Sequence, residues 1–415
     1  MADKLRLIDK VARFYHEQPT DTAFSYFEGR EIVSKTYQET YEGVCACRQY
    51  FCRSGKKRIG LLATNSWQWA CHMWGMFASG ASTALLDPLL PIEDMVSAID
   101  RADLGLLVVE DDLKDLGEKV REQLPQVDVI EFCDMTFEPG MDADFDKWEE
   151  GDSIFFTSGT SKHSKVVITP TCSIAGQILA NMEVLRYVPG KTMMNPLPFH
   201  HSFGFVMLNL FYEGGCPIFI SSMKTILHDI RKIQPTMLAS VPNATEFLLK
   251  KKILKHPIES MVVAGSYCPP ELAARVREQG VIILPEDDVD TLTLHSYAHV
   301  MIADDGEVVV TCPYHMKEYY KNPEETAEVL HGDTVYTGDM GFLDDEGKLH
   351  IMGRKKNMIV MHNGEKVFCT DVDAELTALP CISDGAVIYK DQMLVAVVAP
   401  DKGMSKEDIA GSIEE

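Results

Sequence analysis

The sequence lacks any apolar run that approaches the roughly 18 to 20 residues of a membrane-spanning helix. Its first residues, "MADKLRLIDKVARFYHEQ", also lack the apolar core and small-residue cleavage site of a secretory signal. They are typical of an amphipathic surface helix instead. We therefore expect no integral membrane association and a cytoplasmic location.

The sequence also has few basic residues relative to acidic ones, and its cysteines show no regular spacing. Lys and Arg total 39 against 63 Asp and Glu, which gives a net charge of -24. Nucleic acids are bound through clustered basic side chains, so this balance argues against a nucleic-acid partner. The 11 cysteines are scattered, with one close pair at Cys45 and Cys47 and no C-x-x-C motif. Reduced thiols in a cytoplasm are the simplest interpretation.

Short apolar runs alternate with longer helical patterns over most of the chain. After an expected hairpin at 24–37, apolar strand-like runs occur at 58–63, 83–87, 104–110, 216–221, 236–241, 260–265 and 281–284, and helical patterns at 65–80 and 92–102. This alternation predicts β-α-β units with mostly parallel sheets covered on both faces. The predicted fold class is α/β, with a large multi-layer N-terminal domain of stacked sheets.

The pattern changes at about Gly306. The stretches "GEVVVTC" and "TVYTGDMGFLDDEGKLHIMG" alternate with a period of two around turn residues, which predicts antiparallel hairpins. A small α+β module is expected after them. We predict an N-terminal domain at 1–353 and a C-terminal lid at 354–415. The closing "SKEDIAGSIEE" resembles a helix that has only begun, so we expect the lid to be incomplete.

The stretch "FFTSGTSKHSKVVITP", at 155–170, places a Ser/Thr/Gly-rich turn between two apolar runs. Such a turn offers backbone N–H groups and hydroxyls to anionic oxygens, and a nearby lysine adds positive charge. Turns are also enriched in Ser and Gly for steric reasons alone. The residues by themselves leave open both a phosphate cradle and a polar hairpin turn. The Walker pattern G-x-x-x-x-G-K-[ST] is absent, which argues against a P-loop NTPase.

The loop resembles the phosphate-binding signature of the adenylate-forming superfamily, which includes acyl-CoA synthetases and peptide-synthetase adenylation domains. Five further stretches resemble that family's motifs in the same order: "NPLPFHHSFGF", "VVAGSYCPPEL", "EYYKNPEETAEVL", "YTGDMGFLDDEGKLHIMGRKKNMI" and "NGEKVFCTDVDAEL". The family's Tyr-Gly-x-Thr-Glu motif is missing, and so is the C-terminal segment with its catalytic lysine. In the loop, the residues that match the signature or change it conservatively are Thr157, Ser158, Gly159, Thr160, Ser161 and Lys165.

The resemblance implies a role for each matching residue. The loop residues Thr157, Ser158, Gly159, Thr160 and Ser161 would hydrogen-bond the β- and γ-phosphates of ATP, while Lys165 steadies the loop or the leaving group. The implied nucleotide contacts elsewhere are Gly265 and Ser266 beside the adenine, Asp339 on the ribose hydroxyls, and Arg354 on the ribose or a phosphate. An ionised carboxylate is an acceptor only, so it suits two hydroxyl donors.

Two more positions follow from the same resemblance. Lys356 falls where the family's small domain pivots between its two half-reactions. His201 falls at the border of the acyl pocket; on a strand, its neighbour His200 would point to the opposite face. No metal-ligand spacing accompanies either histidine, which argues against zinc. The metal ligands stay unassigned, with Glu286, Asp287 and Asp288 as unaligned substitutes for the missing glutamate.

The implied activity is activation of a small carboxylic acid, fatty or aryl, by ATP and Mg²⁺, followed by transfer to coenzyme A. Two alternatives remain. The missing motifs are compatible with a catalytically impaired relative that binds nucleotide or an acyl ligand as a sensor or partner. The acceptor thiol could also belong to a carrier protein.

Overall fold

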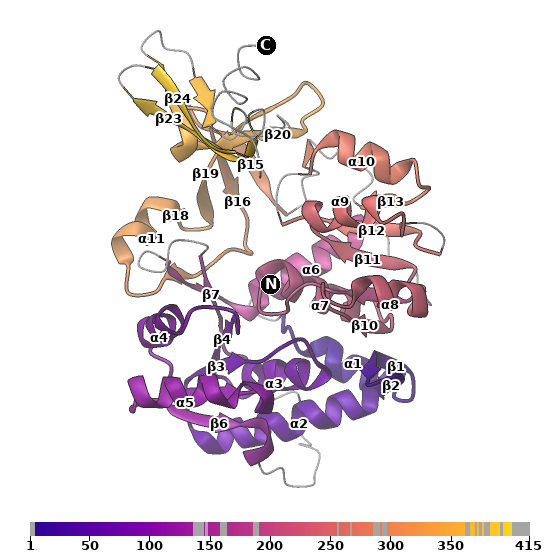
Figure 1. Cartoon of the computed structure of the whole chain (residues 1–415). Coiled ribbons are helices and arrows are strands. Elements are labelled where there is room, and N and C mark those ends of the chain that lie inside the picture. Colours follow the sequence, from indigo (N-terminus) through magenta and orange to yellow (C-terminus); the bar gives the residue numbers. More distant parts are fainter. Residues whose placement is uncertain are drawn as a thin grey trace. The chain divides into compact units, whose positions relative to one another are not determined.

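In a computed structural model, the chain forms two compact units, 1–289 with 313–327 and 290–312 with 328–415 (Figure 1). The structure describes residues 5–135, 145, 148–157, 164–185, 191–254, 257–265, 268–284, 291–292, 297–361, 366–369, 372, 376, 382–390 and 393–400. Within these ranges no helix has both the length and the apolar character needed to cross a bilayer.

The first unit contains a seven-stranded sheet, here sheet A, in which six strands are parallel and the edge strand β2 is antiparallel. Phe24 of β1 pairs with Ile218 of β10, so an N-terminal strand joins a sheet built from much later residues. In spatial order, sheet A consists of β13 (Ile282–Leu284), β12 (Ser260–Val263), β11 (Met237–Ser240), β9 (Met193–Asn195), β10 (Ile218–Ile220), β1 (Thr22–Glu28) and β2 (Glu31–Thr36).

A second seven-stranded sheet, sheet B, has five parallel strands extended by two antiparallel ones. The antiparallel strands β8 and β17 extend it beyond β7. In spatial order, sheet B consists of β17 (Glu318–Tyr319), β8 (Val166–Thr169), β7 (Ser153–Phe156), β4 (Ser82–Leu86), β3 (Arg58–Leu62), β5 (Leu106–Val109) and β6 (Asp128–Glu131).

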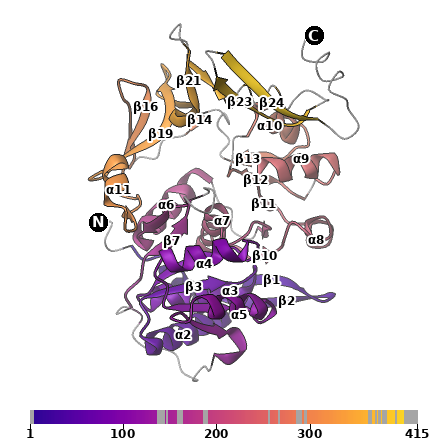
Figure 2. The same cartoon turned by 60° about the vertical axis from the view of Figure 1, so that its left-hand side comes forward.

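Helices cover both faces of each sheet because adjacent strand residues face opposite layers. Leu61 packs into the core between the sheets, whereas Leu62 packs against the outer helices of sheet B. The helices of the middle layer are α1 (Asp9–Glu17), α2 (Tyr37–Ser54), α3 (Trp67–Ala78), α6 (Thr171–Leu185) and α7 (Ser202–Glu213). The outer helices are α4 (Ile92–Arg101) and α5 (Lys114–Gln123) on sheet B, and α8 (Ile226–Ile233), α9 (Pro242–Lys250) and α10 (Pro270–Arg277) on sheet A (Figure 2).

Local sequence explains where the middle helices begin and end. Helix α2 starts at a capping box, in which the Thr36 hydroxyl accepts the Glu39 N–H and the Glu39 carboxylate accepts the Thr36 N–H. It ends at Gly55, whose φ of 64° is the left-handed conformation that glycine adopts without strain. The buried Trp74 indole of α3 then donates to Asn209 of α7 over 3.0 Å, which joins two helices of this layer.

The second unit is built from antiparallel strands. Its main sheet, sheet C, contains β14 (Thr291–Leu292), β20 (Leu349–Arg354), β19 (Thr334–Leu343), β16 (Glu307–Thr311) and β15 (His299–Ile302), with β18 (Leu330–His331) on β19. Two hairpins follow the short 3₁₀ helix η5 (Lys355–Asn357): β21 (Met358–Val360) with β22 (Lys366–Phe368), and β23 (Ile382–Lys390) with β24 (Met393–Pro400).

The predicted fold class is confirmed, with stacked, mostly parallel sheets followed by antiparallel hairpins. The hairpin at 24–37 is β1 with β2, and the pattern after Gly306 is sheet C. The domain boundary between residues 353 and 354 stays a prediction. The two compact units meet at other positions in the chain, after residues 289, 312 and 327. The expected final helix lies outside the described residues.

Candidate active site

The predicted site residues of the first unit, and Asn65, which was not predicted, follow the carboxyl ends of parallel strands. In sheet B, Thr157 follows β7 and Asn65 follows β3, on either side of β4. In sheet A, a turn at 196–201 follows β9, and Gly265 follows β12. Since open α/β sheets bind ligands outside the carboxyl ends of their strands, these positions form one candidate site.

Asn65 connects the carboxyl edges of the two sheets. Its side-chain Nδ2 donates to the Leu197 carbonyl over 2.7 Å, and its Oδ1 accepts the Phe199 N–H over 2.8 Å. An amide that uses both its donor and its acceptor fixes the approach of the turn after β9 to the end of β3. Sequence reasoning missed this residue, although its position between the predicted strand at 58–63 and the rest of the helical pattern at 65–80 was a signal.

The predicted phosphate loop is the turn of a β-hairpin between β7 and β8, which we call the phosphate hairpin (157–165). The Thr157 N–H donates to the Lys165 carbonyl over 3.0 Å, and the Lys165 N–H donates to the Thr157 hydroxyl over 2.9 Å. The Ser164 hydroxyl donates to the Thr157 carbonyl over 2.8 Å. These bonds close the neck of the hairpin. Ser158, Gly159, Thr160 and Ser161 lie outside the described residues, so their phosphate contacts stay a prediction.

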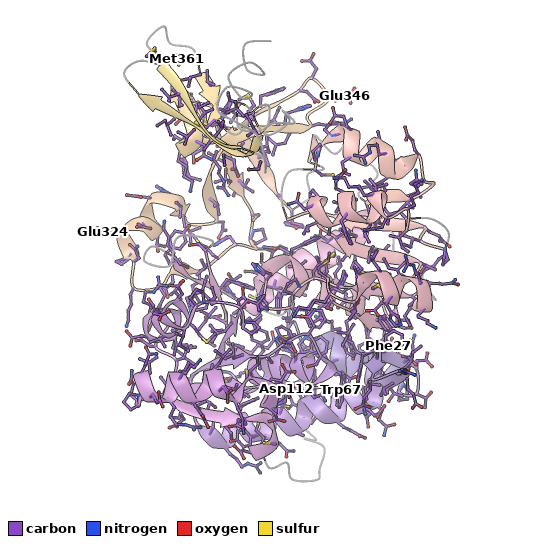
Figure 3. The ribbon with its side chains drawn as sticks, viewed as in Figure 1. Phe27, Trp67, Asp112, Glu324, Glu346 and Met361 are labelled. Carbon is purple, nitrogen blue, oxygen red and sulfur yellow. The ribbon has the colours of Figure 1, made fainter. Side chains whose placement is uncertain are left out.

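Lys165 has two neighbours in the segment 313–327. Its ammonium forms an ion pair with Glu325 of α11 (Pro323–Val329) and lies 4.4 Å from the centroid of the Tyr319 ring. Glu324, the residue before Glu325 in this helix, is labelled in Figure 3. The hydrogen bond from Lys165 lowers the pKa of Glu325. Tyr319 belongs to β17, which pairs with β8, so the sheet itself brings these groups together. The Lys165 charge is therefore already paired within the protein.

The two adjacent histidines lie in a turn before α7, not on a strand. The premise that they point to opposite faces is therefore wrong: their ring centroids are 5.1 Å apart. Buried Asn195 holds this turn, because its Oδ1 accepts the Leu197 N–H and its Nδ2 donates to the Gly204 carbonyl. A Cβ atom on Gly204 would lie 2.0 Å from the Pro198 carbonyl oxygen, so only glycine fits there.

His200 and His201 have different environments. His200 is largely buried, and its Nε2 lies 3.3 Å from Oδ1 of Asp87, which follows β4. Burial lowers the pKa of His200 to about 4; the Asp87 charge opposes this shift and His201 adds to it. His201 is exposed and immediately precedes α7. Sequence reasoning missed Asp87, although it ends the predicted strand at 83–87.

Gly265 has a φ of 90°, a left-handed conformation that disfavours any side chain. A Cβ atom there would lie 3.2 Å from a methyl of Val241 and 3.5 Å from the Phe203 ring. Packing against Val241 and Phe203 and the left-handed backbone therefore both favour glycine here, and its contact with adenine stays a prediction. Ser266 lies outside the described residues, so its contact with adenine stays a prediction.

In the second unit, Asp339 and Arg354 face each other across β19 and β20. Arg354 Nε lies 3.0 Å from Asp339 Oδ1, and Arg354 Nη1 donates to the Thr337 carbonyl over 3.0 Å. Burial raises the pKa of Asp339. The positive charge of Arg354 lowers this pKa, and the negative charge of Glu307 raises it further. The two predicted ribose ligands are therefore ion-paired to each other. Lys356, the predicted hinge, is exposed on η5.

A buried carboxylate supports the Asp339 strand. Glu307 Oε1 accepts the Gly338 N–H over 2.9 Å, and its Oε2 accepts from Lys355 Nζ over 2.8 Å. Lys355 also pairs with Asp305 at 2.6 Å, and these hydrogen bonds raise its pKa. Glu307 thereby links Gly338, the β19 residue before Asp339, to Lys355, the residue before Lys356. Sequence reasoning missed it, because a glutamate in an alternating strand is usually a surface residue.

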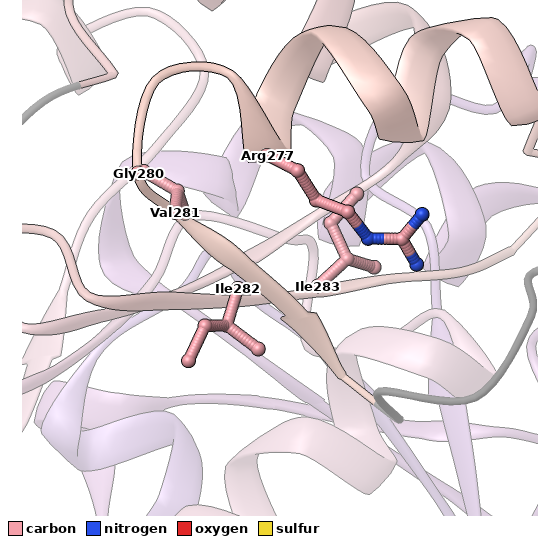
Figure 4. A pocket seen from close by; sticks show the side chains of 5 residues that line it. All are labelled: Arg277, Gly280, Val281, Ile282 and Ile283. Carbon is pink, nitrogen blue, oxygen red and sulfur yellow. The ribbon is translucent and has the colours of Figure 1, made fainter.

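One hollow in the first unit is lined by Arg277, Gly280, Val281, Ile282 and Ile283 (Figure 4). It lies where the chain leaves α10 and enters β13, at the amino end of an edge strand of sheet A. The predicted site residues follow the carboxyl ends of the strands, so this hollow is not part of the candidate site.

Comparisons with known proteins agree with this arrangement. The family model of AMP-binding enzymes matches residues 11–285. A propanoyl:CoA ligase of Mycobacterium tuberculosis, whose acyl group carries a methyl-dioxo-octahydroindene ring system, is 24% identical, and the match covers 99% of this chain and 92% of that protein. The 2-succinylbenzoate–CoA ligase of Bacillus velezensis is 22% identical over 87% of this chain and 80% of that one.

Solved structures show the same fold. The o-succinylbenzoate-CoA synthetase of Bacillus subtilis in complex with ATP and magnesium ion superposes with a TM-score of 0.81 at 18% identity, covering 97% of this chain and 92% of that chain. The family match runs to the end of β13 and includes the strands of both sheets of the first unit except β17, together with the phosphate hairpin and the histidine turn. The chain thus belongs to the AMP-binding enzyme family, as its resemblance to the adenylate-forming superfamily predicted.

Proposed function

We propose that this protein activates a carboxylic acid with ATP, forming an acyl-adenylate and pyrophosphate, and then transfers the acyl group to the thiol of coenzyme A. The observation that carries the proposal is the placement of the phosphate hairpin, the histidine turn and Gly265 at the carboxyl ends of parallel strands within the family match. The curated relatives named above are both CoA ligases, which supports a thioester product. A fatty or aryl acid is the proposed substrate.

The chemistry requires an anionic carboxylate to approach the α-phosphate of a polyanion. Positive charge and oriented donors lower this barrier, because charge accumulates on the phosphoryl oxygens in the transition state. In the proposal, the phosphate hairpin supplies N–H and hydroxyl donors to the β- and γ-phosphates. The adenine lies against Gly265 and Ser266, and the acid lies beside His201.

In the proposed complex, both ion-paired cations exchange or share their carboxylate partner when the nucleotide binds. Lys165 would leave the Glu325 carboxylate for a phosphate oxygen, and Arg354 would share Asp339 with the ribose or reach a phosphate. Exposed ion pairs contribute only about 0 to 1 kcal/mol, so a multiply charged phosphate can replace either partner at small cost. Each pair then neutralises its own cation when no nucleotide is bound.

Magnesium is proposed to arrive with ATP, since Mg²⁺ is usually held by one or two carboxylates together with substrate phosphates. Among the described residues, two groups of three side chains could hold an ion, Asp87 with His200 and His201, and Asp111 with Glu131 and Cys133. Each includes an imidazole or a thiol, which magnesium disfavours. The proposal therefore assigns magnesium no protein ligand; the candidates Glu286, Asp287 and Asp288 lie outside the described residues.

Two alternatives are kept. A carrier-protein thiol could replace coenzyme A as the acceptor, which changes the second half-reaction alone. A catalytically impaired relative that binds nucleotide or acyl ligand is the other candidate, and the missing Tyr-Gly-x-Thr-Glu motif favours it.

The first half-reaction provides the direct test. With ATP, Mg²⁺ and a panel of fatty and aryl acids, we expect acid-dependent exchange of labelled pyrophosphate into ATP. Exchange that appears only with particular acids would identify the substrate class. If no acid supports exchange while ATP still binds, the binding-protein alternative replaces the enzyme.

The hinge assignment predicts a separation of the two half-reactions. Replacing Lys356 with proline fixes φ at this position, so we expect adenylate formation to persist and thioester formation to fall. Pyrophosphate exchange measures the first step and acyl-CoA release the second. Lys356→Ala is the matched control, since it removes the charge and leaves φ free. Equal loss of both steps in the proline variant would contradict a hinge at this residue.

A further inference from the structure

Asp87, His200 and His201 bring three potential metal ligands together from two distant segments. Asp87 follows β4 of sheet B, and the histidines lie in the turn after β9 of sheet A. The Nε2 atom of His200 lies 3.3 Å from Asp87 Oδ1, and the three ligand atoms, one from each residue, all lie within 4.8 Å of one another. The cluster belongs entirely to the first unit.

The two segments are held in place by bonds that do not depend on any metal. The Leu89 N–H donates to Asp87 Oδ1 over 2.8 Å, which orients the carboxylate. Asn65 and Asn195 fix the histidine turn through the contacts at Leu197 and Phe199 described above. The ligands are therefore preorganised, and only the exposed His201 ring has to turn toward the other two.

The Asp87–His200 contact differs from an ordinary aspartate–histidine pair, because a second histidine, His201, lies beside it. Two other such pairs occur among the described residues, His228 with Asp229 and His350 with Asp344. Neither of them belongs to a group of three potential ligands in the described part of the chain. The Asp87 pair differs because a second histidine ring stands 5.1 Å from the first.

Spacing in the sequence argued against zinc because the third potential ligand, Asp87, lies far from the histidines in the chain and only the fold brings it to them. The three donors together identify the class of ion. Two imidazole nitrogens and one carboxylate oxygen suit zinc and related transition metals and do not suit magnesium. In a tetrahedral zinc site with bonds of about 2.0 to 2.1 Å, neighbouring ligand atoms are separated by roughly 3.3 to 3.4 Å. The His200–Asp87 separation already has this value. A water molecule would complete the four positions.

We propose that Asp87, His200 and His201 form a binding site for Zn²⁺ or a similar divalent transition metal at the carboxyl edge of the two sheets. Binding holds the His201 ring toward Asp87. The effect on activity rests on the proposed function. A His201 ring bound to the metal is withdrawn from the acyl pocket that His201 is expected to border. Zinc would then inhibit acid activation by competing with the acid.

The test uses the full chain, purified without metal, with Co²⁺ as a spectroscopic probe and Zn²⁺ as the competitor. We expect one Co²⁺ site with the visible absorption of nitrogen and oxygen ligands, displaced by Zn²⁺. Asp87→Asn, His200→Asn and His201→Asn should each weaken binding by roughly tenfold or more, since loss of even an outer-shell partner typically costs about 10- to 100-fold. His228→Asn, which alters another aspartate–histidine pair, should bind as the parent does.

Several outcomes would overturn the site. Unchanged Co²⁺ affinity in the exposed His201→Asn variant does so, and this variant is expected to fold normally. A thiolate-to-cobalt absorption band that Cys133→Ser removes would place the ion at Asp111, Glu131 and Cys133 instead. If Co²⁺ binds as expected and Zn²⁺ inhibition is not relieved by excess acid, competition at the acyl pocket is wrong. Metal binding is measured without turnover, so its result does not depend on the proposed activity.

Discussion

Replacing Asp339 with alanine is expected to weaken nucleotide binding by about 1 to 3 kcal/mol, roughly 5- to 150-fold in Kd, the usual range for hydrogen bonds to a charged group. In the proposed complex this carboxylate accepts both ribose hydroxyls, and no other acceptor replaces it. The strand that carries it should persist, because its ladder with β20 and the Glu307 bond to Gly338 involve the backbone. Calorimetric titration with ATP measures the change.

Asp344→Ala is the matched control for this variant. Asp344 lies further along the same hairpin and pairs with His350, at a similar exposure, 29% against 30% for Asp339. Asp344 is not proposed to touch the nucleotide, so the affinity of the Asp344→Ala variant for ATP should equal that of the parent protein. ATP binding that is the same in Asp339→Ala and the parent would show that the ribose assignment is incorrect.

Lowering the pH from about 7 to 4 is expected to destabilise the first unit, by about 3 kcal/mol from His72 alone. His72 is buried on α3 and stacks on Phe132 at 4.0 Å between centroids, and its Nδ1 lies 2.7 Å from the Gln68 carbonyl oxygen. Burial lowers the pKa of its imidazole from 6.5 to about 4. Between these values the unfolded state binds more protons than the native state. Stability therefore falls as the pH drops from 6.5, and the loss is complete near pH 4.

The measurement is urea unfolding at a series of pH values. The chain's four tryptophans, Trp67, Trp69, Trp74 and Trp148, all lie in the first unit, so their fluorescence follows its unfolding. His72→Phe removes the titrating group and keeps a ring beside Phe132, and its stability should depend less on pH over this range. His299→Phe, at an exposed position, is the control. Identical pH dependence in the parent and His72→Phe would refute the role of His72.

The order of strands and helices was predictable because each element carries its own periodicity. The runs at 58–63 and 83–87 became β3 and β4 of sheet B, and the patterns at 65–80 and 92–102 became α3 and α4. The hairpin at 24–37 has a glycine turn between alternating strands. These are local signals, so a single sequence is enough to detect them.

Partners of the predicted site residues were not predictable in this way. Asp87 beside His200, Glu325 beside Lys165, and Glu307 beneath Gly338 are contacts between residues far apart in the chain. Nothing in the spacing around His200 points to a strand end in another sheet. The adjacent histidines were misplaced for a related reason, because the expectation of a strand ignored the turn imposed by Pro198 and Gly204.

The sequence by itself determined the family, the layered α/β architecture and the identity of the residues proposed to bind nucleotide, since motifs and periodicity are properties of consecutive residues. Only the tertiary structure decided what those residues touch. It paired Lys165 with Glu325 and Asp339 with Arg354, and it brought Asp87 to the two histidines. The physical reason is that charge pairing and metal ligation depend on distances of a few ångströms between side chains. Strand pairing sets those distances for Lys165 and Asp339, and the approach of the two sheets sets them for Asp87.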